Sequence, residues 1–402
     1  MRTRVVLALL TLALATSGSA QFRLHRTGAL LPVRQNGKWG YIDRTGKIVI
    51  KPQFLSAEEF SEGLAAVTVR TKQGLVYGYI GLTGKFVISP RFENPGYFRE
   101  GMAQMRVGDR TGYINKAGKV VVKPIYGFDC GDFHEGLARV QIGLGISGKV
   151  AYIDSTGKMI IPTQFEAGTD FAEGLAAVQV KKKWGFIDRT GKMVIQPQFD
   201  NAFGFSEGLS PVSTGERYYV SAKTGKTDKD IIVQNAKWGF IDKSGAMVIQ
   251  PTYDMVLPFS DGMAAVMIGE MIRGKWGYID KTGKAVIEPG YSMATEFSDG
   301  LAAVLVGRYN MEETPPKPLS LKDMPKWIYI DKTGKQVVEM QNPFTVPDAF
   351  VNGIARVAII DPDCGPSYID KTGKFIWKDA GWRSRPMTRV TRYPAVPPRA
   401  RP

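Results

Sequence analysis

The stretch GKWGYIDKTGKAVIEP, residues 274–289, decides the fold prediction because close copies of it occur nine times along the chain. Two short apolar runs, Tyr278-Ile279 and residues 285–287, flank a turn that begins with Asp280 and closes with glycine. An aspartate at the start of a turn accepts hydrogen bonds from the turn's own amides, and glycine takes a positive φ without penalty. Pro289 is expected to end the second strand because it cannot donate to a ladder. Each copy therefore predicts a β-hairpin.

A second motif alternates with the first and supplies a further strand to each unit. The first motif, aligned on the aromatic residue before isoleucine, recurs at Tyr41, Tyr79, Tyr113, Tyr152, Phe186, Phe240, Tyr278, Tyr329 and Tyr368. The second, FSEGLAAV and its variants, starts at Phe60, Phe98, Phe133, Phe171, Phe205, Phe259, Phe297 and Phe350. Such alternation marks an array of one supersecondary unit. Short strands without a ten-residue helical pattern predict an all-β protein.

The repeats predict one elongated all-β domain over residues 22–380. Two intervals are long, one because residues 213–231 resemble an extra hairpin and one because residues 312–326 form a proline-rich insertion. Closure into a β-propeller would protect strand edges. Irregular intervals and about nine units instead suit a solenoid, which grows by adding units to its end. We expect an open superhelical β-solenoid-like array, with a closed β-propeller as the alternative.

Four copies carry the residues of a known family. They are Lys38–Asp43, Lys183–Asp188, Lys237–Asp242 and Lys275–Asp280, each with the order Lys-Trp-Gly-aromatic-Ile-Asp. Together with the Ser-Glu-Gly-Leu-Ala-Ala-Val segments, they resemble the bacterial WG-repeat (KWG-repeat) family over nearly all of residues 36–377. The resemblance implies a β-rich repeat domain of modular bacterial proteins, usually with no assigned reaction. The Trp-Gly step is replaced at Tyr77-Gly78, Thr111-Gly112, Val150-Ala151, Trp327-Ile328 and Pro366-Ser367, and those units are expected to pack less tightly or to cap the array.

The repeated tryptophans and acids are interpreted as structural. A tryptophan at each Trp-Gly step fits an apolar plug between units; the alternative is a row of stacking platforms for sugar rings, which replacement by Thr111 and Val150 disfavours. The repeated aspartate fits a turn cap, because Gly81 and Asn115 take its place elsewhere, and the acids of the Glu-Gly segments fit turns as well. The repeat-defining residues are Trp39, Gly40, Asp43, Trp184, Gly185, Asp188, Trp238, Gly239, Asp242, Trp276, Gly277 and Asp280.

No pattern in the chain predicts catalysis or a cofactor. His25 and His134 are the two histidines, and the sequence has no paired-histidine zinc helix or P-loop spacing. Asp361, Asp363 and Asp370 form the best candidate for a metal loop, but the third acid of the usual calcium pattern is missing. We expect a non-enzymatic binding or scaffold module for a protein, glycan or peptidoglycan ligand. A glycan-active hydrolase and a structural spacer are the alternatives.

The two ends of the chain predict export and an interaction with anions. Residues 1–20 have the basic start, apolar stretch and small residues of a signal peptide, so the mature protein is expected in the periplasm or outside the cell, without a transmembrane segment. The formal charge of +15 falls to +13 when Arg2 and Arg4 are removed. Residues 381–402 form a basic, proline-rich tail of the kind that stays disordered. Its possible contacts to an anionic surface are Arg383, Arg385, Arg389, Arg392, Arg399 and Arg401; a purely solubilising tail is the alternative. No specific nucleic acid is expected, and Cys130 and Cys364 are expected to remain isolated thiols.

Overall fold

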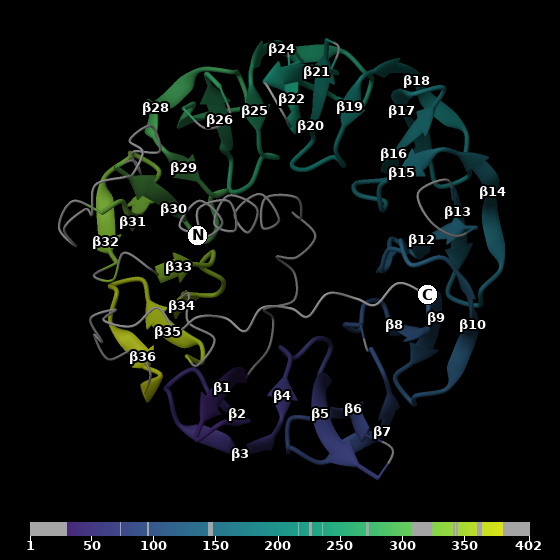
Figure 1. Ribbon diagram of the computed structural model, residues 1–402, viewed down its shortest axis with the longest axis vertical. Coiled ribbons are helices and arrows are strands. Elements are labelled where there is room, and N and C mark those ends of the chain that lie inside the picture. Colours follow the sequence, from purple (N-terminus) through teal and green to yellow (C-terminus); the bar gives the residue numbers. More distant parts are fainter. Residues whose placement is uncertain are drawn as a thin grey trace.

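The computed structural model forms a closed ring of nine small antiparallel sheets, or blades (Figure 1). It describes residues 30–380 apart from 73, 95, 144–147, 216, 225–226, 235, 271–272, 308–323, 341, 343–344 and 360–363, and only the backbone of 217–234. We number the blades in chain order, so that blade 1 holds β1–β3, blade 2 holds β4–β7, blade 3 holds β8–β10 and blade 4 holds β11–β14. Blade 5 holds β15–β18, blade 6 holds β19, β20, β23 and β24, and blades 7, 8 and 9 hold β25–β28, β29–β32 and β33–β36.

The Leu-Ala-Ala-Val segments and the Trp-Gly-Tyr-Ile segments form the two middle strands of each blade. The first set is β1 (Leu31–Gln35), β5 (Ala65–Thr71), β8 (Met102–Val107), β12 (Leu137–Ile142), β16 (Leu175–Val180), β20 (Ser210–Thr214), β26 (Ala264–Ile268), β30 (Leu301–Val306) and β34 (Ile354–Ile359). The second set is β2 (Lys38–Ile42), β6 (Gly74–Ile80), β9 (Arg110–Asn115), β13 (Lys149–Asp154), β17 (Lys183–Asp188), β23 (Lys237–Ile241), β27 (Lys275–Ile279), β31 (Lys326–Asp331) and β35 (Ser367–Asp370). Both are buried on their two faces, which explains their nearly continuous apolar sequences.

Short strands line the inside of the ring, and longer strands form its outer edge. The inner strands are β4 (Ser56–Ala57), β11 (Phe133–His134), β15 (Ala167–Gly168), β19 (Asn201–Ala202), β25 (Met255–Val256), β29 (Met293–Ala294) and β33 (Thr345–Pro347). The outer strands are β3 (Ile48–Phe54), β7 (Phe86–Phe92), β10 (Val120–Tyr126), β14 (Met159–Phe165), β18 (Met193–Phe199), β24 (Met247–Tyr253), β28 (Ala285–Tyr291), β32 (Gln336–Glu339) and β36 (Phe375–Trp377).

The proline of the first motif lies inside an outer strand, so the expectation that it ends the strand is wrong. β28 continues through Pro289 to Tyr291. An outer strand has no further neighbour in its blade, so a missing N–H on its free side breaks no ladder bond, and edge strands are where sheets tolerate proline. The same proline discourages an outside strand from pairing with the edge.

The glycine of the Trp-Gly step lets the outer strand cross close to the middle strand. In blade 6 the register shifts between Trp238 and Phe240 relative to β24. A Cβ atom at Gly239 would collide with the carbonyl of Ile249 and would lie 2.8 Å from the nitrogen of Pro251. The bulge therefore needs a residue with little or no side chain, and blade 4 keeps the same shifted register with Ala151.

Adjacent blades share an aromatic contact and a hydrogen bond. The aromatic residue of the first motif meets the phenylalanine of the next blade's second motif edge to face, as Tyr278 and Phe297 do at 4.7 Å between ring centroids. Where that residue is tyrosine, its hydroxyl donates to a backbone carbonyl of the next blade, as Tyr278 does to Thr295 at 2.8 Å. Both residues of the ring pair are buried, so each blade interface has its own aromatic core.

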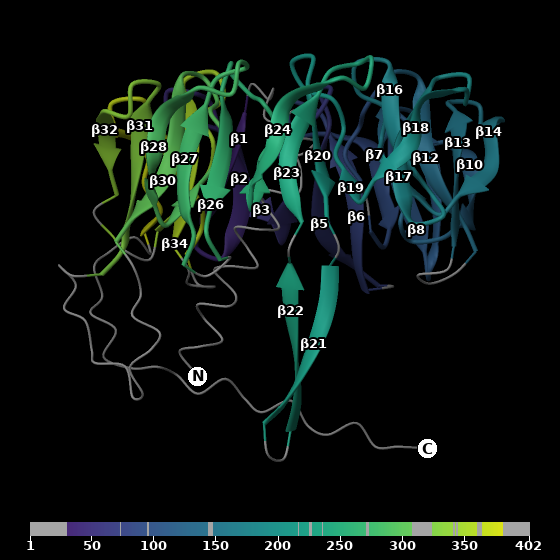
Figure 2. The same ribbon diagram turned by 90° about the horizontal axis from the view of Figure 1, so that it is seen from above.

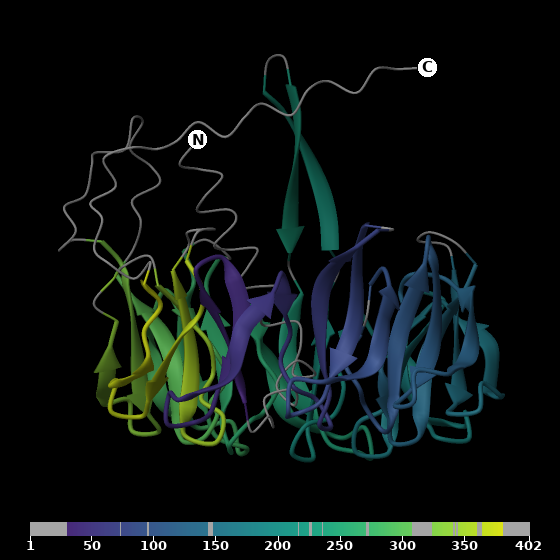
Figure 3. The ribbon, with the colours of Figure 1, turned by 90° about the horizontal axis from the view of Figure 1, so that it is seen from below.

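The first and last blades meet through the same kind of tyrosine hydrogen bond and through an arginine contact, and the ring is closed. The hydroxyl of Tyr368 in blade 9 donates to the carbonyl of Pro32 in blade 1 at 2.9 Å, and Arg44 donates to the carbonyl of Asn352. Figures 1 and 3 show β36 beside the first blade. The open superhelical array expected from the sequence is therefore wrong, and the β-propeller, given as the alternative, is the observed architecture.

The insertions that make the repeat irregular leave the ring intact because they share one face of it. Two β-turn types, the Glu-Gly turns and the Asp-x-x-Gly turns, lie at one end of the middle strands, since Ala65 pairs with Ile80; we call this the turn face. The hairpin of β21 (Arg217–Thr224) and β22 (Thr227–Gln234) leaves the opposite end, between β20 and β23, and projects away from the ring (Figure 2). β30 ends and β31 begins at that same end, and the insertion between them lies outside the described residues.

The tryptophans of the Trp-Gly step are buried to different degrees. Trp238 is 5% exposed, stacks on Phe203 at 5.0 Å and belongs to a core cluster that joins blade 6 to Phe259 and Val266 of blade 7. Trp276 is similarly buried, whereas Trp39 and Trp184 are half-buried at the margin of their clusters. In the described structure the side chain of Trp238 therefore fills the space between blades.

We predict that Trp238→Ala lowers the free energy of unfolding by about 3–5 kcal/mol, as expected for truncating a buried aromatic side chain. Trp184→Ala is the matched control and should cost clearly less, because Trp184 keeps part of its surface in water. Urea denaturation of both variants measures the difference. Equal losses would show that burial between blades does not set the role of Trp238.

A second prediction concerns ring closure. Tyr368→Phe removes the hydroxyl that donates to Pro32 and should destabilise the protein by about 1–2 kcal/mol, because a carbonyl buried at the seam loses its partner. Tyr278→Phe removes the equivalent bond inside the array and serves as the control. Comparable losses in chemical denaturation indicate that the seam is an ordinary blade interface; a neutral Tyr368→Phe would mean that the hydroxyl does not hold the seam.

Candidate functional site

On the turn face, the acid of each Glu-Gly turn bridges to the next blade. These acids have positive φ, between 49° and 59°. The carboxylate of Glu62 accepts from the amide of Gly101 at 3.0 Å, and Glu135 accepts from Gly174 at 2.9 Å. The remaining pairs are Glu100 with Gly136, Glu173 with Gly208, Glu207 with Gly262, Asp261 with Gly300 and Asp299 with Gly353. Every interface from blade 2 to blade 9 thus has such a bond.

Most of these carboxylates also pair with a lysine of the next blade. The lysine follows the first residue of the Asp-x-x-Gly turn, and the pairs are Lys116–Glu62, Lys243–Glu173, Lys281–Glu207, Lys332–Asp261 and Lys371–Asp299, at 2.9–3.5 Å. Arg44, which donates to Asn352 at the seam, holds the equivalent position in blade 1. On the turn face, these acids and lysines therefore pair with one another across the blade interfaces.

The repeated aspartates cap their own turns, in the geometry the sequence suggests. Asp280 accepts from the amides of Thr282 and Lys284 at 2.9 and 3.1 Å and from the Thr282 hydroxyl at 2.6 Å. That hydroxyl and the two amides hold the pKa of Asp280 below its usual value. The same contacts occur at Asp43, Asp188, Asp242 and Asp370.

The repeat breaks most clearly on the inner side of blades 3, 4 and 5. Ser61, Ser206, Ser260 and Ser298 of the second motif each donate to a phenylalanine carbonyl in the next blade. Arg99 and His134 occupy this serine position in blades 3 and 4. Ionisable groups thus replace a small hydroxyl at two successive interfaces.

These two residues belong to a polar cluster that crosses both interfaces. Arg99 Nε lies 3.5 Å from Asp132 Oδ2, and Gln104 Nε2 donates to Asp132 Oδ1 at 2.8 Å. Beyond them, Asp170 of blade 5 lies 3.5 Å from Arg139 and 4.0 Å from His134. The pairs join blade 3 to blade 4 and blade 4 to blade 5. We call Arg99, Asp132, His134, Arg139 and Asp170 the inner polar cluster.

Burial shifts the pKa values within the inner polar cluster. Burial raises the pKa of Asp170, which Arg139 partly offsets, and it raises the pKa of Asp132, which the Gln104 hydrogen bond opposes. Burial and the charge of Arg99 lower the pKa of His134, because both disfavour the charged imidazole. Burial lowers the pKa of Arg139, but its pairs with Asp129 and Asp170 outweigh that effect and raise it overall.

Sequence reasoning missed the inner polar cluster because its members belong to three different repeats. The available signal was positional: aligned copies place serine where Arg99 and His134 stand, and Asp132 and Asp170 both directly precede the motif's phenylalanine. A further signal is Gly131, where a Cβ atom would collide with the carboxylate of Asp170. Such a set can bind a polar ligand or transfer protons, but its charges already pair across blade interfaces.

Several expected site residues lie elsewhere or outside the described residues. Asp361 and Asp363 fall in a gap, as does the whole arginine tail, and Asp370 caps its turn instead of lying in a metal loop. In the described part of the chain, no three His, Cys, Asp or Glu side chains are grouped to hold a metal ion. Cys130 and Cys364 are not joined by a disulfide.

Two further features of the described residues bear on a site. A hollow at the seam, lined by Arg44, Arg356 and Tyr368 among others, has a volume of about 20 Å³, which holds about one water molecule and no larger ligand. No helix among the described residues has the length and hydropathy of a membrane span.

We predict that the pKa of His134 lies below 6.5 in the folded protein and rises in Arg99→Gln, because that change removes a neighbouring positive charge. As pH falls from 6.5 through the lowered value, the unfolded chain binds a proton before the folded chain does, so stability falls. NMR titration in a His25→Gln background follows His134 alone. A pKa at or above 6.5, unchanged by Arg99→Gln, would contradict the buried position.

Several solved structures resemble the chain at low sequence identity. Solved structures that resemble the chain include the tricorn protease, at 12% identity over 87% of this chain with a TM-score of 0.23; the chain covers 44% of that protein, less than half its length. Hsv2p of Kluyveromyces lactis is similar at 9% identity over 67% of this chain and 89% of its own, with a TM-score of 0.38. A protein of unknown function from Bacteroides caccae is similar at 13% identity over 60% and 92% of the two chains, with a TM-score of 0.27.

No curated protein matches the chain. The family described as "WG containing repeat" matches seven segments, residues 39–70, 77–110, 112–143, 151–184, 184–218, 238–271 and 276–308. These segments cover more than half of the chain, and each runs from the second middle strand of one blade to the first middle strand of the next, as residues 39–70 do from β2 to β5. The chain therefore belongs to the WG-containing repeat family.

Proposed function

We propose that this protein is an exported, non-catalytic binding or scaffold module of the cell envelope. The observation that carries the proposal is the use made of its ionisable groups. In the described structure the acids of the Glu-Gly turns, the capping aspartates and the inner polar cluster all take part in contacts that hold turns or blades together. These ionisable side chains thus hold the ring together, and in this proposal the surface of the ring binds a partner.

The proposed location rests on the sequence. The first twenty residues have the order of a signal peptide, and a mature excess of positive charge suits anionic envelope polymers. The six arginines of residues 381–402 offer planar, forked donors for phosphate or carboxylate. In this proposal the tail holds the ring at an anionic surface of the envelope, and the ring contacts a protein or glycan.

A glycan-active hydrolase is the second candidate, and one observation favours it. Asp132 and Asp170 lie in the same cluster and both have raised pKa values, and glycoside hydrolysis commonly uses a carboxyl group with a raised pKa as the acid. Against it, Asp132 is paired with Arg99 and Gln104, and Asp170 is packed against Gly131. Both carboxyl groups are therefore engaged in joining blades.

The test is retention of the mature chain on envelope fractions at low and high salt. We expect retention at low salt that weakens with added salt, because exposed charges are screened over about 10 Å at 0.1 M. Replacing all six tail arginines by glutamine should reduce retention and its dependence on salt. Retention that ignores both salt and the tail change would reject the tail's role.

Two further outcomes separate the candidate functions. Failure of the intact mature chain to associate with any envelope fraction contradicts the binding module. Turnover of a peptidoglycan or glycan substrate that is lost in Asp132→Asn or Asp170→Asn, with the fold preserved by circular dichroism, would establish the hydrolase instead.

A further inference from the structure

The outer strands carry one exposed side chain at every second position. In blade 1 the exposed set is Lys47, just before β3, and Val49, Lys51 and Gln53 within it, while Ile50 and Phe54 on the other side of the strand are buried. Val49 is 47% exposed. Outer strands form the circumference of the ring (Figure 1), so these positions repeat around its outside. The side chains at these positions therefore determine the chemistry of the outer surface and are not part of the core.

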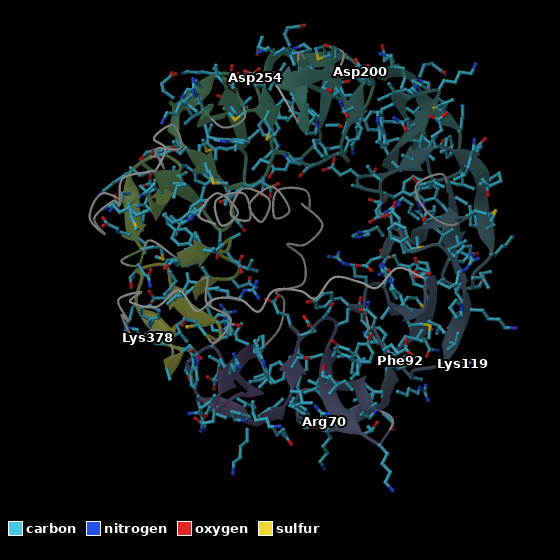
Figure 4. All side chains as sticks on the ribbon, in the orientation of Figure 1. Arg70, Phe92, Lys119, Asp200, Asp254 and Lys378 are labelled. Atoms are coloured by element: carbon cyan, nitrogen blue, oxygen red, sulfur yellow. The ribbon has the colours of Figure 1, made fainter. Side chains whose placement is uncertain are left out.

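Four consecutive blades, 9, 1, 2 and 3, have only cations as charged residues at these positions. Each blade contributes a pair, and the eight residues are Lys374, Lys378, Lys47, Lys51, Lys85, Arg91, Lys119 and Lys123. All eight are exposed. We call this set the basic arc. Figure 4 labels Lys378 and Lys119 on the outer side of the ring, one in each terminal blade of the arc.

The equivalent positions of blades 4 to 8 are much less basic. They contain the lysines Lys158, Lys192, Lys284 and Lys335 together with the acids Glu288 and Glu339. Glu339 is also bound by Lys326 at 2.6 Å. Eight cations without an acid therefore face four cations with two acids on the rest of the circumference. The asymmetry does not follow from the repeat, which requires none of these exposed residues.

The turns beside the basic arc strengthen its positive charge. Blades 2 and 3 have Gly81 and Asn115 where the other blades have the capping aspartate. Asn115 still accepts from the amides of Ala117 and Lys119 at 3.1 and 3.0 Å, so the turn is kept without its negative charge. Glu93, just beyond β7, is the nearest exposed acid of blade 2.

Apolar side chains separate the cations along the arc. Between the two cations of their blades, Val49 is 47% exposed and Val87 is 56% exposed; at the neighbouring positions of the outer strands, Phe86 is 42% exposed and Val120 is 41% exposed. Exposed apolar groups between charges suit a ligand with apolar faces as well as acidic groups. A sugar acid has both, because its ring presents C–H groups and its carboxylate provides the charge.

We propose that the basic arc binds a flexible acidic polysaccharide of the uronic-acid class, which lies along the outside of blades 9, 1, 2 and 3. The inference rests on the proposed function and names its ligand class. The cations follow a convex circumference over four of nine blades, so a flat lipid surface could touch only part of them at once, whereas a flexible chain can follow the curve. Lysine, a hydrated point charge, does not demand one fixed geometry from its partner, as suits a polymer.

Binding along several blades predicts a strong dependence on polymer length. Each exposed ion contact is weak, but linked contacts bind with a high effective concentration. A long polygalacturonate should therefore bind far more tightly than free galacturonic acid. Neutral dextran should not bind, because it lacks the carboxylates.

The test compares two charge-matched variants of the full mature chain, each with its tail. The arc variant carries Lys47→Gln, Lys51→Gln, Lys119→Gln and Lys123→Gln; the control variant carries Lys158→Gln, Lys192→Gln, Lys284→Gln and Lys335→Gln. Titration with polygalacturonate should weaken roughly tenfold for the arc variant, as for the loss of four exposed contacts, and less than twofold for the control. Thermal unfolding checks that both variants fold, and Lys51→Gln with Lys123→Gln replaces the arc variant if it does not.

Three outcomes would overturn the proposal. Equal weakening in the two variants would mean attraction by net charge alone, and no binding by the parent chain would exclude the ligand class. Binding of anionic vesicles, but not of polygalacturonate, that is lost in the arc variant would assign the arc to a membrane surface. Envelope retention of the same variants keeps the two proposals distinct, since parent retention without polygalacturonate binding leaves the binding module in place and rejects only this ligand.

Discussion

The ring depends on a carboxylate of one blade that accepts a hydrogen bond from a backbone amide of the next. The acid holds a positive φ to make it, as Glu62 does at 50°, and such a backbone costs about 1–2 kcal/mol for a residue with a side chain. The bond to Gly101 offsets that cost. Because this bond recurs at every interface from blade 2 to blade 9, and the aromatic pair at every interface from blade 1 to blade 9, each blade is placed on its neighbour in a similar way. Repetition of one placement brings blade 9 to blade 1.

Closure of this kind needs no strand shared between the ends of the chain. Blade 1 is formed by β1–β3 and blade 9 by β33–β36, and among the described residues no sheet mixes the two. The seam consists of side-chain contacts, among them Tyr368 with Pro32 and a cluster around Val33 and Ile42. Outer edges stay open in every blade, and proline in most outer strands limits pairing with other chains. Proline in the outer strands thus protects the open edges of the blades from pairing with other strands.

The local structure could be predicted from the sequence far better than the global shape. Asp280 and its glycine specify the hairpin turn through contacts within five residues, and the apolar runs specify strands. The angle between blades depends on contacts such as Glu62 with Gly101, which are 39 residues apart in sequence. No feature of the motif indicates that the acid of a Glu-Gly turn forms a hydrogen bond with the next blade. For the same reason Arg99 and His134 looked like ordinary variation, because their partners lie on other repeats.

Because the blades share one structure, their sequences can differ freely only at positions that do not hold the ring together. The middle strands are buried on both faces, and the Glu-Gly turns are fixed by the next blade, so a change there weakens an interface. Most exposed positions of the outer strands have no such duty, although Arg91 donates to the carbonyl of Gly118 in the next blade. The capping position shows how the two demands combine: Asn115 keeps the turn hydrogen bonds of an aspartate while removing its charge. This turn of blade 3 therefore differs in charge from the equivalent aspartate turns while keeping their hydrogen bonds. Such freedom allows a nearly symmetric ring to carry an asymmetric surface.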